Sequence, residues 1–174
     1  MHVDLSQLEA DELYIAHQYD ELFDLPESEV SVIVPPAVCL WLRRTRGREI
    51  RVKGSLTTTV QVLCDRCLVA FNVPIEVSFD LLYAPIETLT PQQDVPLTEE
   101  DLDYGFYRDN RLEVDGLVQE QIFLALPFRR LCRSECRGLC PQCGADLNQQ
   151  TCSCQPQRVS AWWSALQELN KTNH

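Results

Sequence analysis

Apolar and polar residues alternate over long stretches in the first half of the chain, and this two-residue period is typical of half-buried β-strands. The pattern covers residues 38–44 and 49–63, which the segment RTRGRE joins with Gly47 at the turn. We therefore predict a long hairpin in this region. A third β-patterned stretch continues over residues 67–83, with a bend at Pro74.

The second half of the chain changes to helical spacing. Residues 86–111 contain two prolines and a surplus of acids, so they predict a long mobile or functional loop. A helix near residues 115–126 follows, with Asp115 as its N-cap and Pro127 as its stop. Its sheet-facing side is predicted to hold Leu117, Val118, Gln121, Ile122 and Ala125. A last helix over residues 158–174 is predicted from Val159, Trp162, Trp163, Leu166 and Leu169.

The fold class that these patterns favour is α+β, with an antiparallel sheet or partial barrel, packed helices and a C-terminal Cys-rich zinc module. The chain has 174 residues, of which 45% are hydrophobic, so it can bury one sizeable core. We divide it into an acidic and partly helical N-terminal segment, a β-rich core with the first helix, a zinc module and a terminal helix. These parts span residues 1–30, 31–127, 128–157 and 158–174.

The acidic first segment also bears on the compartment of the protein. Residues 1–29 carry nine acids, no Lys or Arg and no apolar run, so they match neither a signal nor a transit peptide. The longest apolar stretches, such as residues 122–126, are too short to cross a bilayer. We therefore expect a cytoplasmic, reducing setting without membrane attachment. In such a setting, clustered cysteines bind metals or act as redox thiols more often than they form disulfides.

Eight of the nine cysteines form four close pairs, which is the strongest chemical signal in the sequence. In chain order, the pairs are Cys64 with Cys67, Cys132 with Cys136, Cys140 with Cys143, and Cys152 with Cys154. Tetrahedral Zn²⁺ binds four thiolates, so eight cysteines predict two closed structural sites. Loop closure favours one ion between the third and fourth pairs, which a short loop separates, and another between the first and second. The alternative places the second and third pairs on one ion.

Other uses of these thiols remain open at this point. Four disulfides would fit the same count, CDRC alone could be a thioredoxin-like dithiol, and four thiolates can hold iron as well as zinc. The missing secretory signal favours metal over disulfides. The β-patterned flanks of CDRC disfavour the redox motif, because that motif needs a helix N-terminus. The ninth cysteine, Cys39 in AVCLWL, is predicted to be a core residue.

Several of these segments together resemble the YceD family of large ribosomal RNA subunit accumulation proteins. The resemblance covers about residues 45–170 and rests on CDRCL, VDGLVQEQIFLALP, LCRSECRGLCPQCGADLNQQTCSC and RVSAWWSALQEL. It implies a bacterial factor, or a plastid stromal one in a photosynthetic eukaryote, that supports synthesis, processing or stability of large-subunit ribosomal RNA. It also implies that the first four paired cysteines form one unit, and the last four an optional second unit.

The charge distribution limits how this chain could contact RNA. The formal net charge is −11, and each ion held by four thiolates adds about −2, so the chain as a whole repels a phosphate backbone. Basic residues nevertheless cluster on the predicted hairpin and beside the zinc module. The candidate RNA or partner contacts are Arg43, Arg44, Arg46, Arg48, Arg51, Lys53, Arg129 and Arg130. A solvated strand edge explains the hairpin cations equally well, and Arg66 and Arg133 are expected to donate hydrogen bonds to thiolates.

The sequence lacks a convincing catalytic constellation. Its histidines are His2, His17 and His174, and closed thiolate sites leave no position for water or substrate, so we predict a non-enzyme. The leading hypothesis is a zinc-stabilised factor in ribosome assembly that contacts the large-subunit ribosomal RNA precursor or a basic ribosomal protein. Two alternatives are a redox-responsive zinc chaperone and an acidic adaptor that binds a basic ribosomal protein.

Overall fold

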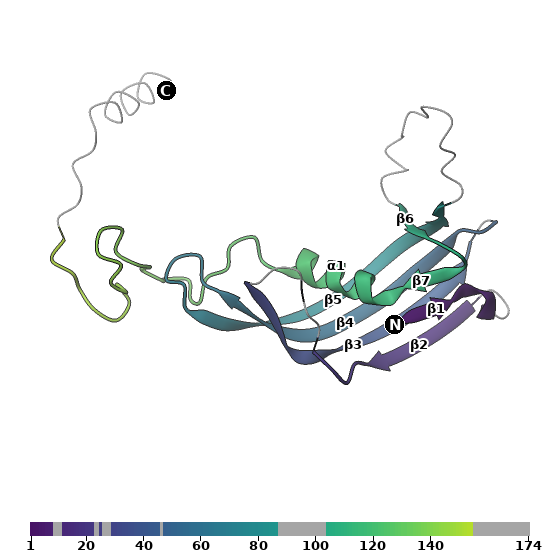
Figure 1. Cartoon of the computed structure of the whole chain (residues 1–174), viewed down its shortest axis with the longest axis horizontal. Coiled ribbons are helices and arrows are strands. Elements are labelled where there is room, and N and C mark those ends of the chain that lie inside the picture. Colours follow the sequence, from purple (N-terminus) through teal and green to yellow (C-terminus); the bar gives the residue numbers. More distant parts are fainter. Residues whose placement is uncertain (9–11, 23–24, 26–28, 46, 87–103, 155–174) are drawn as a thin grey trace, which may run out of the picture.

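A five-stranded sheet forms the body of the molecule, and one helix lies along it (Figure 1). This computed structural model describes residues 1–8, 12–22, 25, 29–45, 47–86 and 104–154. The large sheet has, in spatial order, β2 (Glu12–Gln18), β3 (Val30–Arg44), β4 (Ile50–Leu63), β5 (Ala70–Pro85) and β6 (Tyr104–Tyr107). The small sheet pairs β1 (His2–Asp4) with β7 (Arg111–Glu113), and the helices of the described residues are a 3₁₀ turn (Leu5–Gln7) and α1 (Val114–Ala125).

The predicted hairpin is confirmed and belongs to a longer antiparallel meander. β3 pairs with β4 as far as Arg44↔Ile50, and β4 pairs with β5 along its whole length. Gly47 lies at the hairpin turn with φ of 58°, a value that glycine adopts without strain. The register of β3 shifts on both sides of Val34, beside two prolines that cannot donate to the ladder, so the strand is irregular there.

The sheet is mixed, where the sequence predicts an antiparallel one. β6 pairs with β5 in parallel, with Leu82 opposite Tyr104. Gly105 makes this pairing close, because a Cβ atom there would lie 2.5 Å from the Tyr83 ring. The end of the predicted loop over residues 86–111 is therefore ordered as β6 and the start of β7, and residues 87–103 lie outside the described part.

The N-terminal segment contributes strands, whereas a partly helical segment is predicted. In β2, half-buried Leu13 and Ile15 alternate with exposed neighbours, and the strand pairs with β3 in antiparallel register. The helical content of the described residues before β3 is one 3₁₀ turn, which Asp4 caps by accepting a hydrogen bond from the Ser6 N–H. The predicted helix over residues 158–174 lies outside the described residues, and the division of the chain into four parts stays a prediction.

The hydrophobic core lies between α1 and one face of the large sheet. Fully buried Leu40, Leu42 and Leu56 of the sheet belong to the same cluster as Ile122 of α1. Each side chain of this size contributes about 1.5–3 kcal/mol when it is fully buried. The buried residues of α1 are Val114, Leu117, Val118, Gln121 and Ile122. The predicted apolar face is therefore present, except that Ala125 is only half-buried.

The start of α1 differs from the prediction by two residues. Glu113 is the N-cap and makes no side-chain capping bond. Asp115 lies in the first turn, where its carboxylate binds the ammonium group of Met1 and accepts a hydrogen bond of 2.7 Å from the Tyr19 hydroxyl. Asp115, the predicted N-cap, thus connects the N-terminal residues to the first turn of the helix.

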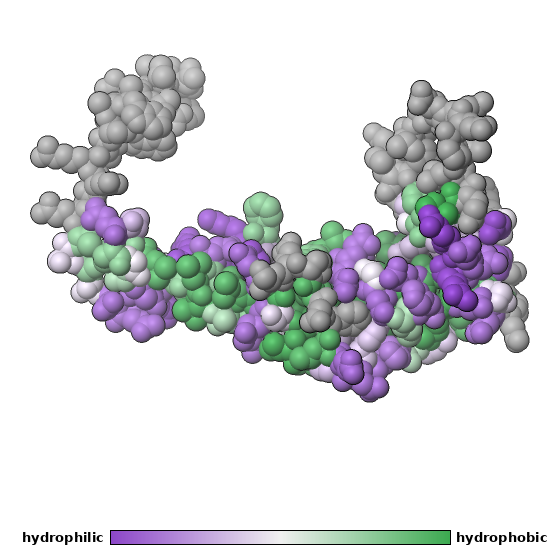
Figure 2. Space-filling view, viewed as in Figure 1, coloured by the Kyte–Doolittle hydropathy of each residue, from purple (hydrophilic) through white to green (hydrophobic). Residues whose placement is uncertain are grey.

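The other face of the large sheet is exposed. Because Val38, Leu40 and Leu42 point into the core, the alternate residues of β3 point outward. Cys39 is therefore exposed, and its predicted place in the core is wrong. Hydrophilic residues gather over the end of the molecule that carries β1, β6 and β7, on the face that Figure 2 shows.

Candidate metal centres

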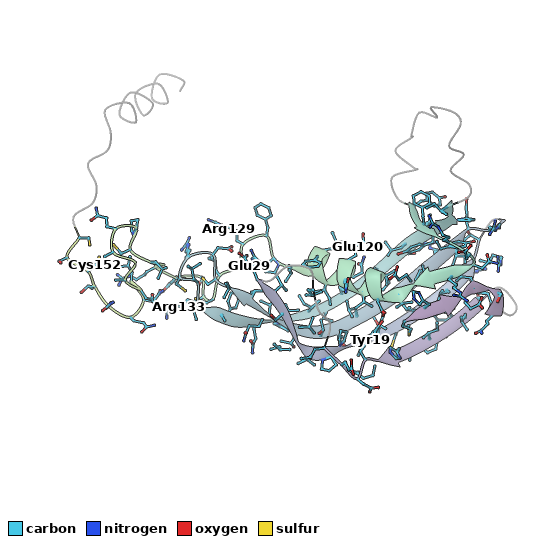
Figure 3. All side chains as sticks on the ribbon, in the orientation of Figure 1. Tyr19, Glu29, Glu120, Arg129, Arg133 and Cys152 are labelled. Carbon is cyan, nitrogen blue, oxygen red and sulfur yellow. The ribbon has the colours of Figure 1, made fainter. Side chains whose placement is uncertain are left out.

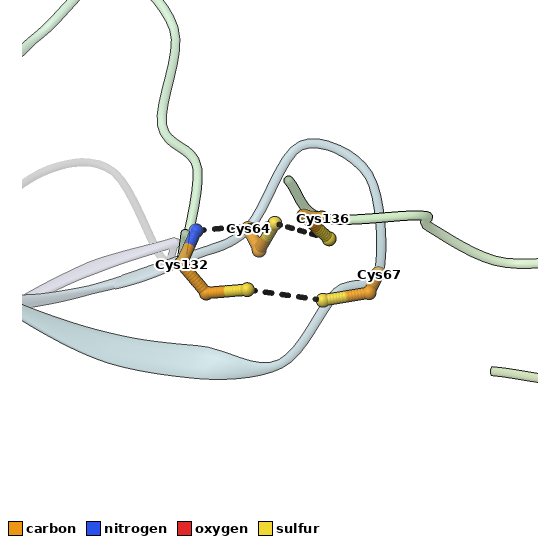
Figure 4. Close-up of side chains that lie close together, drawn as sticks. All are labelled: Cys64, Cys67, Cys132 and Cys136. Carbon is orange, nitrogen blue, oxygen red and sulfur yellow. Dashed lines mark hydrogen bonds between the residues drawn. The ribbon is translucent and has the colours of Figure 1, made fainter. Parts of the chain in front are cut away.

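Four cysteines from distant parts of the chain meet at one end of the sheet. Cys64 and Cys67 lie in the turn between β4 and β5, and Cys132 and Cys136 lie in the segment that follows α1 (Figure 4). The four sulfur atoms all lie within 4.8 Å of one another. We call them the first cysteine group. It joins the segment after α1 to the end of the β4–β5 hairpin.

The spacing of the sulfur atoms fits a tetrahedral metal ion. The Sγ atoms of Cys64 and Cys136 are 3.8 Å apart, and those of Cys67 and Cys132 are 3.6 Å apart. A tetrahedral zinc ion with Zn–S bonds of about 2.3 Å has sulfur–sulfur edges of about 3.8 Å. A disulfide requires sulfur atoms about 2.05 Å apart, and all nine cysteines are free thiols. The first group therefore has the geometry of a closed thiolate site.

Within the first group, hydrogen bonds favour negative charge on Cys64, whereas burial and the neighbouring cysteine sulfurs raise the pKa of Cys132 to about 12. Burial raises the pKa of the Cys64 thiol, but the backbone N–H groups of Cys132, Cys67 and Arg66 outweigh burial and lower it to about 6. Asn148 donates from Nδ2 to the Cys136 sulfur at 3.5 Å. Such N–H···S bonds stabilise thiolates, which are the form that binds metal.

The second cysteine group consists of Cys140, Cys143, Cys152 and Cys154, whose sulfur atoms also lie within 4.8 Å of one another. It closes on itself beyond the end of the sheet, where Figure 3 labels Cys152. Hydrogen bonds from the backbone N–H groups of Cys143 and Gln142 lower the pKa of Cys140 to about 6. In both C-x₂-C pairs, backbone N–H groups of the turn thus lower the pKa of the first cysteine.

The two C-x₂-C turns have the same backbone design. In each turn, the N–H of the residue after the second cysteine donates to the carbonyl of the first cysteine at 2.9 Å. That residue is Leu68 in the first turn, with φ of 58°, and Gly144 in the second, with φ of 72°. Positive φ suits glycine but is uncommon for leucine. Leu68 therefore holds an unfavourable backbone conformation, and its side chain is exposed.

Arg66 links the two groups. Its guanidinium Nη1 donates to the Cys136 carbonyl at 2.8 Å, and its own carbonyl accepts a hydrogen bond of 3.0 Å from the Leu139 N–H. Its side chain thus bonds a carbonyl oxygen, whereas a hydrogen bond to a thiolate is predicted. Gly138 packs against this contact, because a Cβ atom there would lie 2.9 Å from the Arg66 carbonyl oxygen.

Replacing Gly138 by alanine is expected to loosen the junction between the two groups. Both Gly138→Ala and Gly144→Ala place alanine at positive φ, which costs about 1–2 kcal/mol. Only Gly138→Ala also clashes with backbone, since no atom lies within 4 Å of a Cβ at Gly144. In thermal unfolding of the metal-loaded protein, Gly138→Ala should melt several degrees below Gly144→Ala, at about 2–4 °C per kcal/mol. Equal melting temperatures would show that this contact is unimportant.

The basic residues that are predicted to contact RNA or a partner lie in two regions of the structure. Their side chains differ in exposure to solvent and in their hydrogen bonds. Arg43, Arg51 and Lys53 point outward from the large sheet, whereas Arg44 donates to the Leu5 carbonyl and Arg48 to Asn110 Oδ1. Arg46 lies outside the described residues. Hydrogen bonds from Arg51, with a smaller contribution from Lys53, lower the pKa of Asp80 to about 2, so this carboxylate stays charged at neutral pH.

Near the first group, one arginine forms ion pairs within the protein and two arginines are exposed. Arg130 forms ion pairs with Glu29 at 3.4 Å and Asp65 at 3.5 Å, and its N–H donates to Asp65 at 2.7 Å. Arg129 and Arg133 are exposed on the segment that follows α1 (Figure 3). Arg130 thus anchors the segment after α1, whereas Arg129 and Arg133 face solvent.

Sequence reasoning missed two features of the site. Asn148, in the DLN segment, accepts from the Arg137 N–H at 2.8 Å and contacts the Cys136 sulfur, so it connects the second loop to the first group. Tyr14 and Trp41 form an exposed pair on the outer face of the sheet, beside the basic residues of the hairpin. Neither feature follows from local spacing, because each depends on contacts between distant segments.

Residues 52–170 match the family described as large ribosomal RNA subunit accumulation protein YceD. The chain belongs to the YceD family. An uncharacterised protein of Mycobacterium leprae is 27% identical over 123 residues, which are 71% of this chain and 54% of that protein. The chloroplastic large ribosomal RNA subunit accumulation protein YCED homolog 1 of Zea mays is 27% identical over 148 residues, with 72% of this chain and 50% of that protein covered. The large ribosomal RNA subunit accumulation protein YceD of Haemophilus influenzae is 25% identical over 122 residues, with coverage of 70% and 66%.

The YceD match has a clear position in the fold. It begins in β4 and covers α1 and both cysteine groups, so β2 and β3 lie outside it. The chain spans about half the length of the first curated relatives it matches. No solved structure matches the chain. Within the described part of the chain, no helix combines the length and the apolar composition that crossing a membrane requires.

Proposed function

We propose that this member of the YceD family is a zinc-binding, non-enzymatic factor that supports synthesis, processing or stability of large-subunit ribosomal RNA. The observation that carries the proposal is the first cysteine group, whose sulfur atoms lie at tetrahedral spacing inside the region that matches the family. The protein would act wherever large ribosomal subunits are assembled. Its partners would be the large-subunit RNA precursor, a basic ribosomal protein, or both.

The metal would have a structural task in this proposal. Cys64, Cys67, Cys132 and Cys136 would hold one ion, and Cys140, Cys143, Cys152 and Cys154 a second. Zinc bound by four thiolates has no open position for water or substrate, so it crosslinks the chain rather than performing a reaction. The first ion would fix the segment after α1 to the end of the β4–β5 hairpin. The second would close the following loop on itself.

The exposure of several cationic side chains supports a partner that carries negative charge. Arg43, Arg51 and Lys53 face outward from the sheet, and Arg129 and Arg133 are exposed near the first group. The net charge of −11 opposes nonspecific attraction to RNA, so contact would depend on these local cations. The same net charge supports a second candidate, an acidic adaptor that binds a basic ribosomal protein.

Removal of the protein tests the proposal directly. In cells of the source organism that lack the chain, large-subunit ribosomal RNA is expected to fall relative to small-subunit RNA, as measured by quantitative RNA blots. The wild-type chain should restore the ratio, and a Cys64→Ser variant should fail to do so, because the first metal site is lost. A Cys39→Ser variant is the matched control and should restore the ratio fully.

Two results would redirect the proposal. An unchanged ratio of the two RNAs in cells that lack the chain would contradict the function. Co-purification of basic ribosomal proteins that survives nuclease treatment, with no RNA retained, would favour the adaptor over direct RNA contact.

A further inference from the structure

Two large aromatic side chains lie exposed on the open face of the sheet. Tyr14 of β2 is opposite Trp41 of β3, and their rings pack edge to face with centroids 6.3 Å apart and an interplanar angle of 78°. Tyr14 is 61% exposed and Trp41 is 56% exposed. Tryptophan and tyrosine side chains usually bury most of their area. Two such side chains that are exposed next to each other therefore indicate a binding surface.

Cations surround this pair on the same face. Lys53 of β4 is the cross-strand neighbour of Trp41, and Arg51 is the neighbour of Arg43 one row along. Residues opposite each other in antiparallel strands point to the same side of the sheet. The side chains of Arg43 and Lys53 are 69% and 60% exposed. Aromatic rings and cations thus share one surface.

The carboxylates on this surface only partly neutralise the cations. Glu12 lies 3.5 Å from Arg43, and Asp80 lies 2.7 Å from Arg51 and 3.2 Å from Lys53. Within the rows of Trp41 and Arg43, three cations therefore face two carboxylates, although the chain as a whole carries a net charge of −11. Exposed ion pairs contribute only about 0–1 kcal/mol each, so an arriving phosphate can replace a carboxylate at small cost.

We propose that this surface, which we call the aromatic platform (Tyr14, Trp41, Arg43, Arg51 and Lys53), binds single-stranded RNA. A base stacks on the Trp41 ring, and the neighbouring cations contact the phosphates on either side. The inference rests on the proposed function and gives that function an RNA-binding surface. Only Lys53 falls within residues 52–170, so most of the platform lies outside the YceD match.

The shape and chemistry of the platform favour single strands over duplexes. A-form duplexes hide their bases in the stack, whereas single strands offer unstacked bases to aromatic side chains. An exposed sheet face with aromatic rings and flanking cations can bind such a strand, because the rings stack on its bases and the cations contact its phosphates. Stacking tolerates any base, so the binding is expected to depend little on sequence.

The same surface suits a protein partner or a second copy less well. Protein interfaces place their aromatic residues within an apolar core that excludes water. The next row of this face holds Cys39, Ser55 and Ser78, and the polar pair Lys53↔Asp80 completes the row of Trp41. Among the described residues, the rings thus sit mostly among small and charged side chains, without a broad apolar patch around them.

Binding of a fluorescent single-stranded RNA to the full-length, metal-loaded protein tests the platform. The probe is a 12-nucleotide RNA of mixed sequence, compared with the same RNA annealed to its complement. Wild type should bind the single strand more tightly than the duplex, and Trp41→Ala should weaken binding about 5- to 150-fold, the range for loss of one stacked base. Trp41→Phe should retain most of the affinity. Leu124→Ala is the control, because Leu124 is an exposed residue of α1 outside the platform.

Salt dependence separates the stacking contact from the charge contacts. Arg43→Ala should reduce the slope of log affinity against log salt by about 0.7, the value for one phosphate contact on a single strand. Trp41→Ala should leave that slope unchanged while it lowers affinity at every salt concentration. Circular dichroism and metal content of each variant establish that the fold is intact.

Each remaining outcome decides against the platform. Equal RNA affinity of wild type and Trp41→Ala, or preference for the duplex, would overturn the inference. So would loss of self-association, or of binding to a ribosomal protein, in a Trp41→Ala variant when the wild type binds no RNA. The proposed function would survive all these results, because it depends on the RNA ratio in cells that lack the chain. An unchanged ratio would remove that function without altering the measured RNA affinity.

Discussion

Replacing Cys64 by serine is expected to reduce the metal content of the protein from two ions per chain to one. The Cys64 side chain is fully buried in the first cysteine group, and a serine hydroxyl cannot replace a thiolate ligand there. Structural zinc sites contribute on the order of 10 kcal/mol to the folding of zinc-finger peptides, so the loss should also melt the segment after α1. Mass spectrometry of dialysed protein measures the metal, and limited proteolysis locates the melted segment.

Two serine variants serve as controls for this experiment. Cys143→Ser should also leave one ion, but it should spare the first group, so proteolysis should then cut only after residue 139. Cys39→Ser should keep both ions, because Cys39 is exposed on the sheet and outside both groups. Wild-type protein without metal, or a Cys64→Ser variant that keeps two ions, would contradict the assignment of these sites.

Replacing Ile122 by alanine is expected to lower the free energy of unfolding by about 2–5 kcal/mol. Ile122 is fully buried between α1 and the sheet, so the change removes apolar contacts and leaves a cavity. Urea unfolding followed by circular dichroism measures the loss. The matched control is Leu124→Ala on the same helix, where the side chain is 71% exposed, and it should change stability by less than about 0.5 kcal/mol.

The destabilised α1 should also affect the first metal site, since the chain passes from α1 to Cys132 within a few residues. Chelator should therefore remove metal faster from Ile122→Ala than from Leu124→Ala. Equal unfolding free energies for the two variants would show that the packing of α1 on the sheet is not as described.

The hairpin of β3 and β4 could be predicted from sequence because its alternation is long and Gly47 marks the turn. The β4–β5 connection could be placed because CDRC interrupts two β-patterned runs. The eight cysteines also divide between the two groups in the way that loop closure predicts. That these cysteines bind zinc stays a prediction, as do the RNA contacts of the arginines.

The outward direction of Cys39 and Trp41 could not be predicted. In AVCLWL, both faces of β3 carry apolar residues, so the period that tells one face from the other is lost. The parallel partner of β5 could not be predicted either, because β6 is only four residues long and pairs across a long connection. The place of β2 could not be predicted, because it depends on the pairing of β2 with β3.

A metal ion in the first cysteine group would alter how the molecule responds to a pulling force. The group joins Cys64 to Cys136, so the 71 residues from 65 to 135, with β5, β6, β7 and α1, would form a closed ring. Tension applied at the two ends of the chain would pass through the ion and bypass that ring. About 240 Å of extended chain, at about 3.4 Å per residue, would stay hidden until the thiolate bonds broke. An unfolding trace in an optical trap would then lengthen by that amount after chelation.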